Sequence, residues 1–311
     1  NVSGCLKACQ ALSEAITPVV DAKNLRFVDP FGICLLGATF HKLQRQGKQV
    51  NVIGLSPELA GYLQRMDLFQ NVFINGKSHS VDLRHNRSDA LVELTCLRDH
   101  HAVDHTANRL SKAIVGKLPE VDPNEKPDEM TGMTTAERYQ DPIQYSLSEL
   151  LENALTHARR SGHAHACVWV ASQYYPRTDE IKCAVVDDGC GFLETLKSHP
   201  KLSSHTHHSA ILAAMQPRVS CNRALGIRSD TVNQGVGLTT TCRITLAAGG
   251  GMLIASGDAL HATASSKTRT GSFWTGVAIS MNFYRQKLPD VRYRELLPPF
   301  DAAQLPPLRF E

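Results

Sequence analysis

A chain of 311 residues, with 42% hydrophobic and 20% charged residues, has a globular composition and room for one large domain or two ordinary ones. The formal net charge of +3 is too near zero to indicate a nucleic-acid surface, so nucleic acid is not an expected partner. Nine scattered cysteines without a C-x-x-C pair, no apolar run of the roughly 20 residues that cross a bilayer, and no signal-peptide pattern predict a reducing, cytoplasmic location without membrane attachment.

The first third of the chain alternates short apolar strands with amphipathic helices. The helix expected over 33–46 has apolar residues three and four apart and ends before Gly47. Ser56 is expected to cap a further helix, with Pro57 in its first turn. Strands are predicted over residues 25–28, 49–55 and 90–97, and a last helix over 101–118. This order predicts a small α/β unit.

Proline, acidic residues and glycine are concentrated between residues 119 and 133. Such a composition favours a linker, so we predict a domain boundary over residues 120–135. The expected units are an α/β domain with a connecting helix over 1–120, a second domain over 135–290, and a proline-rich tail over 291–311.

The second unit is predicted to contain one long helix and several strands. Asp141 is the expected N-cap before Pro142, and Gly162 is the expected C-terminal stop. Strands are predicted over residues 166–171, 181–186, 252–255 and 273–281, and an irregular lid over 197–234. Helices packed on a sheet give α+β as the predicted fold class.

Two groups of residues in this unit have the chemistry of a nucleotide site. Glu149 and Asn153 are four residues apart, so a helix presents both on one face. Glu149 can hold a water or hydroxyl, and Asn153 can offer its amide oxygen to a hard cation. Asp187 ends an apolar strand, and Gly189 and Gly191 after it allow a backbone to approach a ligand closely. Together these features indicate a purine-nucleotide pocket.

The same residues resemble the sequence boxes of the GHKL ATPase superfamily. The boxes are Glu149-x-x-x-Asn153-Ala, Asp187-x-Gly189-x-Gly191 and Gly235-Val-Gly237-Leu238, in the family order. The superfamily includes gyrase-type ATPases, histidine kinases and anti-sigma serine kinases. The resemblance covers roughly residues 135–285 and implies the Bergerat ATP-binding fold, in which helices pack on a mixed sheet.

The resemblance implies that these residues bind ATP or ADP with Mg²⁺. Asp187 would accept a hydrogen bond from the exocyclic amine of adenine, and Asn153 would ligate Mg²⁺. Glu149 would act as general base on the attacking water or hydroxyl. The other expected cofactor-binding residues would line the base, the ribose or the phosphates: His157, Gly189, Gly191, Phe192, Gly235, Val236, Gly237 and Leu238.

The last strand of this unit departs from the family pattern. Where the family often has Gly-Thr, this chain has Gly276-Val277. Thr275 is the hydroxyl expected to support Asp187 through a water, although consecutive residues of a strand face opposite sides.

The first unit is similar to a STAS domain of the anti-sigma antagonist type. The similarity lies in Phe27-Val28-Asp29-Pro30-Phe31-Gly32 and the strand and helix order after it, over about residues 20–75. Regulated members carry a phosphoacceptor serine after the aspartate, whereas this chain has Pro30 and Phe31. The resemblance therefore implies a STAS-like scaffold or docking unit that is not phosphorylated.

Three functions remain open from the sequence. The first is a Mg²⁺-dependent ATPase whose lid closes over the nucleotide to regulate a partner. The second is an anti-sigma-type serine/threonine protein kinase that uses the same pocket. The third is a nucleotide-gated interaction module without hydrolysis. Each implies a protein partner on the STAS-like surface, and a homodimer is one arrangement.

Overall fold

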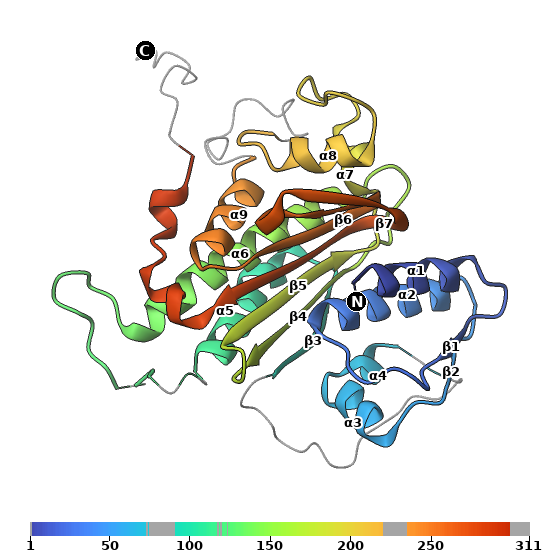
Figure 1. Cartoon of the computed structure of the whole chain (residues 1–311), viewed down its shortest axis with the longest axis horizontal. Coiled ribbons are helices and arrows are strands. Elements are labelled where there is room, and N and C mark those ends of the chain that lie inside the picture. The colour runs from blue at the N-terminus through green and yellow to red at the C-terminus, as the bar shows by residue number, and fades with distance from the viewer. Residues whose placement is uncertain are drawn as a thin grey trace.

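The chain folds around a five-stranded antiparallel sheet with the strand order β3-β4-β5-β7-β6 (Figure 1). The computed structural model describes residues 2–72, 74, 91–116, 118, 120–122, 124–219 and 235–298. The strands are β3 (Leu91–Leu97), β4 (Val168–Tyr175), β5 (Glu180–Asp187), β6 (Gly251–Ala262) and β7 (Lys267–Tyr284). The fold is therefore α+β, as predicted. The prediction of a mixed sheet is wrong for these five strands, because each neighbouring pair is antiparallel.

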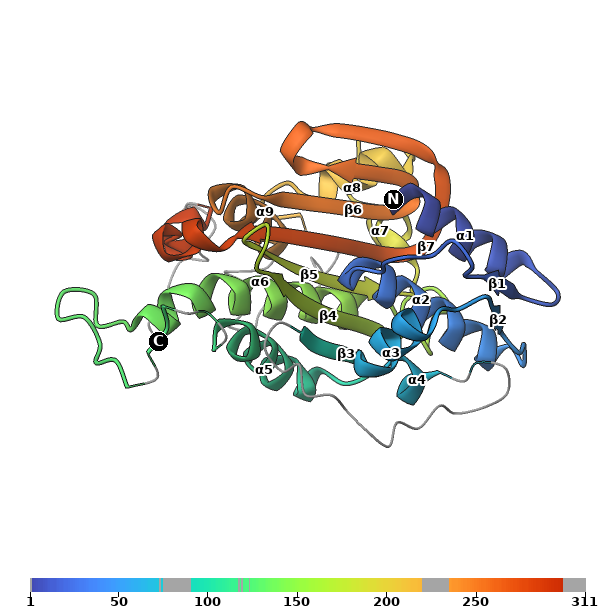
Figure 2. The same ribbon diagram turned by 60° about the horizontal axis from the view of Figure 1, so that its bottom comes forward.

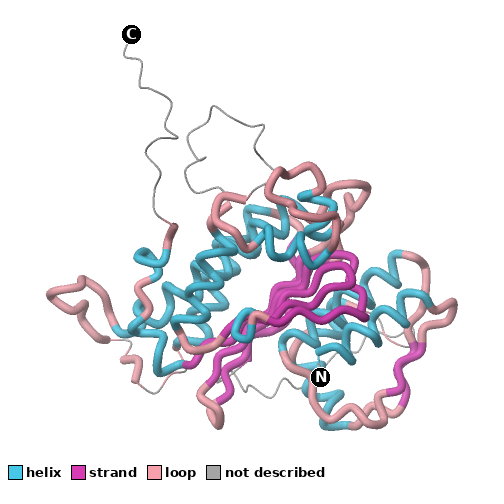
Figure 3. The backbone as a smooth tube through the Cα atoms, turned by 45° about the horizontal axis from the view of Figure 1, so that its top comes forward, coloured by secondary structure: helices cyan, strands magenta, loops and turns pink. Residues whose placement is uncertain are grey.

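Helices cover both faces of this sheet (Figures 2 and 3). One face carries α5 (Val103–Val115), α6 (Thr135–His157) and α9 (Gly237–Ala247), and the other carries α1 (Val2–Glu14) and α2 (Pro30–Arg45). Two hydrophobic cores result, one on each side of the sheet. Alternate residues of β4 divide between them, since Val168 and Val170 face the α6 side while Trp169 faces α2.

The layer built around α2 also contains a small parallel sheet and two short helices. β1 (Val19–Asp21) pairs with β2 (Asn51–Ile53), and α3 (Pro57–Arg65) and α4 (Leu68–Asn71) follow. The Ser56 side chain accepts a hydrogen bond from Leu59 N, which confirms the predicted cap of α3. The strand predicted over 25–28 is wrong. Those residues lead into α2, where the Asp29 side chain caps the helix by accepting from Gly32 N at 2.9 Å.

The predicted division into units 1–120 and 135–290 does not match the packing. β3 lies at the edge of the large sheet, and α5 packs on α6 in the same hydrophobic core. The polar composition near 120–135 instead reflects an exposed turn, in which Asp128 Oδ1 accepts from Met130 N and Thr131 N. Of the predicted tail, residues 293–296 form a short 3₁₀ helix, η5 (Tyr293–Leu296), and residues 299–311 lie outside the described part.

The helix that carries the candidate site residues is α6, and its predicted ends are wrong. It begins at Thr135, where Thr134 and Glu137 form a capping box, so Pro142 lies inside the helix. It ends at His157 with Ala158 as C-cap, before Gly162. The last two turns of α6 therefore hold Asn153 and His157.

The predicted lid over 197–234 is partly helical. α8 (His207–Ala214) follows α7 (Gly191–Leu196), and the Thr206 side chain caps α8 by accepting from Ser209 N. Residues 220–234 are outside the described part of the chain. Among the helices that are described, none has the length and apolarity needed to span a membrane.

Candidate functional site

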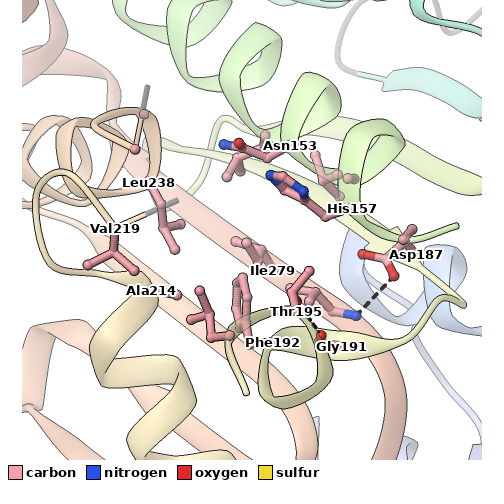
Figure 4. Close-up of a pocket in the computed structure, with 18 residues that line it drawn as sticks. Asn153, His157, Asp187, Gly191, Phe192, Thr195, Ala214, Val219, Leu238 and Ile279 are labelled. Carbon is pink, nitrogen blue, oxygen red and sulfur yellow. Dashed lines mark hydrogen bonds between the residues drawn. The ribbon is translucent and has the colours of Figure 1, made fainter. Parts of the chain in front are cut away.

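A pocket lies between α6, the end of β5, the middle of β7 and the segments that carry α7, α8 and α9 (Figure 4). Its atom-free volume is about 850 Å³, which includes open solvent at its mouth. Polar side chains enter it from three elements: Asn153 and His157 from the last two turns of α6, Asp187 from the end of β5, and Thr195 from α7. The pocket is thus mostly apolar with a few convergent polar groups.

The Asp187 carboxylate is held by one of its oxygens. Oδ1 accepts hydrogen bonds from Gly189 N at 2.9 Å and Val277 N at 3.2 Å. The other oxygen makes no hydrogen bond to the described residues, so it is free to accept from a ligand. The side chain of Trp274 also donates to the Asp187 carbonyl at 2.9 Å. Burial raises the pKa of Asp187 to about 7, while the two backbone donors oppose that rise.

Two glycines allow the backbone to pack closely around Asp187. A Cβ on Gly276 would lie 2.1 Å from the Asp187 carbonyl oxygen and 2.4 Å from Oδ1. A Cβ on Gly189 would lie 2.3 Å from the carbonyl oxygen of Ala158, which accepts a hydrogen bond from Cys190 N. The turn after β5 is therefore fastened both to β7 and to the end of α6. We call residues 187–191 the Asp187 turn.

Replacing Gly276 with alanine is expected to destabilise the chain by about 1–3 kcal/mol, because the added methyl group overlaps the Asp187 backbone and carboxylate. Thermal unfolding measures the effect. Gly61→Ala is the matched control, since a Cβ at Gly61 of α3 meets no atom within 4 Å. Unchanged unfolding of Gly276→Ala would contradict the close packing at this turn.

The other end of the pocket is the N-terminus of α9. Gly235 and Gly237 line it, and the N-cap residue Val236 makes no side-chain cap hydrogen bond. The first amide groups of a helix have no partner within the helix, so they are able to bind an anion. Glu149 lies beside them, because a Cβ on Gly237 would be 1.9 Å from Glu149 Oε2. Burial raises the pKa of Glu149, a rise that a hydrogen bond from Tyr145 opposes.

His157 is the third polar group contributed by α6. Burial lowers its pKa to about 4, with a smaller contribution from the nearby Arg160. The imidazole is therefore neutral at neutral pH, and it can donate and accept hydrogen bonds without adding charge to the pocket.

The remaining walls are apolar and come from distant parts of the chain. Phe192 was expected from the sequence, whereas most of its neighbours were not. The pocket residues that were not predicted as site residues are Leu150, Ala154, Ala158, Val185, Thr195, Leu196, Ala214, Val219, Val277 and Ile279. Only α6 and β7 offered a signal for some of these, through their apolar periodicity. Ala214 and Val219 depend on how the segment after α7 folds back over the sheet.

Most of the predicted site residues are brought together. The pocket is lined by Asn153, His157, Asp187, Gly191, Phe192, Gly235, Gly237 and Leu238, and Glu149 lies next to it at Gly237. Gly189 donates to Asp187, and Val236 is the N-cap of α9. Thr275 is placed differently. Its hydroxyl lies 3.4 Å from Lys42 Nζ of α2, and Thr275 is not among the residues that line the pocket.

Metal-binding side chains are sparse around the pocket. The described residues contain no group of three or more His, Cys, Asp or Glu side chains that could hold a metal ion. A cation at Asn153 would therefore take most of its ligands from water and from an anionic ligand, which is a common arrangement for Mg²⁺.

Comparison with known proteins adds no relative. No family model, no curated protein and no solved structure matches this chain.

Proposed function

We propose that the chain binds ATP with Mg²⁺ in this pocket and hydrolyses it, with Glu149 as general base. The observation that carries the proposal is the state of Asp187, a buried carboxylate with one oxygen fixed by two backbone amides and the other free in an apolar cavity. A carboxylate in this state binds a ligand that donates a hydrogen bond and has an apolar ring, as the adenine base does.

The wall composition supports a flat aromatic ligand at this end. Phe192, Ile279 and Val277 border the space beside Asp187. Gly191 has a φ of +77°, and a Cβ there would lie 2.8 Å from the Thr275 carbonyl and 2.9 Å from Ser256 Oγ. The chain can therefore turn sharply under the base only because this residue is glycine.

The α9 end of the pocket suits a triphosphate. The first amides of α9, which have no partner within the helix, favour negative charge, and Asn153 offers an amide oxygen in the same pocket. Asn153 would hold Mg²⁺ at this end, and the ion would offset the charge of the phosphates. Asn153 Oδ1 would orient that ion, and the α9 amides would hold the terminal phosphate.

Glu149 is well placed to accept a proton at this end. Its carboxylate lies at Gly237, in the first turn of α9, and its pKa is raised by burial. Glu149 Oε2 would take a proton from a water that attacks the terminal phosphate. Because the base is on α6 and the amides are on α9, hydrolysis depends on how these two helices pack.

The arrangement of the elements also supports the GHKL resemblance. α6 and α9 pack together on an antiparallel sheet, and all three sequence boxes border one cavity. We propose that the α1–α4 layer on the other face is a STAS-like docking unit for a protein partner. Its Asp29-Pro30 pair starts α2 and offers no hydroxyl for phosphorylation.

Titration calorimetry tests ATP binding directly. ATP, ADP and a non-hydrolysable ATP analogue are each titrated with and without Mg²⁺. We expect ATP and the analogue to bind more tightly with Mg²⁺ present, and ADP to depend on Mg²⁺ less because it lacks the terminal phosphate. Absence of heat with all three nucleotides, for a chain that is folded by circular dichroism, would contradict the proposal.

A further inference from the structure

The side of the Asp187 turn that faces away from the pocket is contacted by the last helical turn of α2. Arg45 Nη1 lies 3.8 Å from Asp188 Oδ2, and Lys42 Nζ lies 3.4 Å from Thr275 Oγ1. Asp188 follows Asp187 directly, and Thr275 precedes the glycine that packs on Asp187. One helix of the N-terminal layer therefore reaches both strand segments that hold the proposed base-recognition carboxylate.

Asp188 is a buried charge with an incomplete set of partners. Its side chain is 2% exposed. Oδ1 accepts from Cys167 N at 2.7 Å, whereas Oδ2 is buried without a hydrogen bond to any described residue. Arg45 makes the only ion pair recorded for Asp188 in the described part of the chain, and its own side chain is 38% exposed. A buried carboxylate that loses its cation is costly, so the turn depends on Arg45.

Other charged groups nearby do not replace Arg45. His41 lies one helical turn before Arg45, and its Nε2 accepts a hydrogen bond from Arg98 Nη2 at 3.1 Å. Burial and the nearby Arg98 lower the pKa of His41, so its imidazole is neutral at neutral pH. Arg98 is thus directed to His41, and Arg45, whose Nη1 also donates to the His165 carbonyl, is the cation that faces Asp188.

The contact between α2 and the sheet is close enough to transmit a displacement. A Cβ on Gly37 would lie 2.9 Å from the ring of Trp169, which shows that α2 packs directly on β4 at this point. Val168 pairs with Asp187 in the β4–β5 ladder, so β4 and the Asp187 turn are joined by backbone hydrogen bonds. Packed elements of this kind move together and do not deform independently.

We propose that Arg45 is a positioning residue for the Asp187 turn, and that the α1–α4 layer thereby controls the affinity of the pocket for the adenine base. The inference rests on the proposed function. Arg45 acts through Asp188, because the two aspartates are consecutive and face opposite sides of the turn. A partner that binds the exposed C-terminal end of α2 and draws Arg45 away would weaken ATP binding, and bound ATP would weaken the binding of that partner to the same extent.

The test compares ATP with inorganic tripolyphosphate, which lacks the base, for the parent chain and Arg45→Ala with Mg²⁺ present. We expect Arg45→Ala to weaken ATP binding about tenfold, within the usual range of coupling between sites, and tripolyphosphate by less than about twofold. Arg45→Lys keeps the charge and is expected to restore most of the ATP affinity. Arg26→Ala is the matched control, an exposed arginine of the same layer without a recorded partner in the described chain.

A second readout does not require ATP. The chain has two tryptophans, and the Trp274 indole N–H is bonded to the Asp187 carbonyl. In a ¹⁵N-labelled sample without nucleotide, Arg45→Ala is expected to shift the Trp274 indole signal, whereas Arg26→Ala leaves it in place. Asp188→Asn removes the buried charge, so adding Arg45→Ala to it should shift that signal less than in the parent.

The outcomes separate this inference from the proposed function. If the parent binds no ATP but Arg45→Ala shifts the Trp274 signal, the nucleotide function is wrong and the positioning of the turn stands. If Arg45→Ala binds ATP within about twofold of the parent and leaves the Trp274 signal unmoved, Arg45 does not position the turn. If Arg45→Ala weakens the binding of ATP and of tripolyphosphate equally and also lowers the unfolding temperature, the positioning role is overturned as well, because that pattern indicates a general loss of structure.

Discussion

Replacing Asp187 with asparagine is expected to weaken ATP binding by at least about 100-fold while the chain stays folded. Asparagine can still accept the bonds from Gly189 N and Val277 N with its amide oxygen. Its NH₂ group would then take the place of the free carboxylate oxygen and face the adenine amine, donor against donor. A buried site that loses its hydrogen-bond complement discriminates strongly against the ligand. Calorimetry with ATP and Mg²⁺ measures the loss.

The same substitution is expected to raise the stability of the nucleotide-free chain at alkaline pH. Burial raises the pKa of Asp187 from 3.8 to about 7, so the folded state binds this proton more tightly than the unfolded state does. The resulting stability is present below about pH 4 and is lost as pH rises to about 7. Above that pH the parent holds a buried charge that costs at most a few kcal/mol, at roughly 1.4 kcal/mol per pKa unit.

Thermal unfolding at pH 5 and pH 8 checks the stability effect. The unfolding temperature of Asp187→Asn should exceed that of the parent by more at pH 8 than at pH 5. An asparagine variant that is less stable at both pH values would show that the carboxylate serves structure more than ligand binding. ATP binding equal to that of the parent would exclude Asp187 from base recognition.

Replacing Glu149 with glutamine is expected to reduce phosphate release at least about 100-fold without reducing ATP affinity. Glutamine has nearly the same shape but cannot accept the proton from the attacking water. Steady-state phosphate release measures the turnover, and calorimetry measures the binding. Unchanged turnover would exclude Glu149 from the chemistry.

The chain offers a matched control for this variant on the same helix. Glu152 is exposed on α6 and pairs with His100 at 2.7 Å. Glu152→Gln removes a carboxylate that does not line the pocket and acts on Glu149 only through its charge, so its turnover should stay close to that of the parent. Labelled ATP then distinguishes the remaining alternatives. Free phosphate alone supports hydrolysis, a labelled protein supports transfer, and tight binding without either product supports a nucleotide-gated module.

The sequence predicted the parts of the fold that depend on local patterns. Ser56 before Pro57 located the start of α3, and the apolar periodicity located α2 and the five strands of the large sheet. The prediction from sequence failed where two local signals for a helix start lie close together. Asp141-Pro142 has the pattern of a helix start, but Thr134 and Glu137 provide a complete capping box upstream, and packing holds Pro142 inside α6.

The candidate site was predictable where its residues lie in short motifs and not elsewhere. Spacing alone placed Asn153 and His157 on one helical face, and the strand end located Asp187. The placement of Thr275 did not follow from strand alternation, because the register of β6 and β7 is irregular there and its hydroxyl lies 3.4 Å from Lys42 Nζ. The interaction of Arg45 with Asp188 joins residues 143 positions apart in sequence, and no local pattern records such a contact.

A crystal structure with a non-hydrolysable ATP analogue and Mg²⁺ tests the central claim most directly. The account predicts the adenine amine within hydrogen-bond distance of Asp187, Mg²⁺ at Asn153, and the terminal phosphate at the amides of Gly237 and Leu238 beside Glu149. A pocket that stays empty at saturating analogue, or an analogue bound with its base away from Asp187, would contradict it.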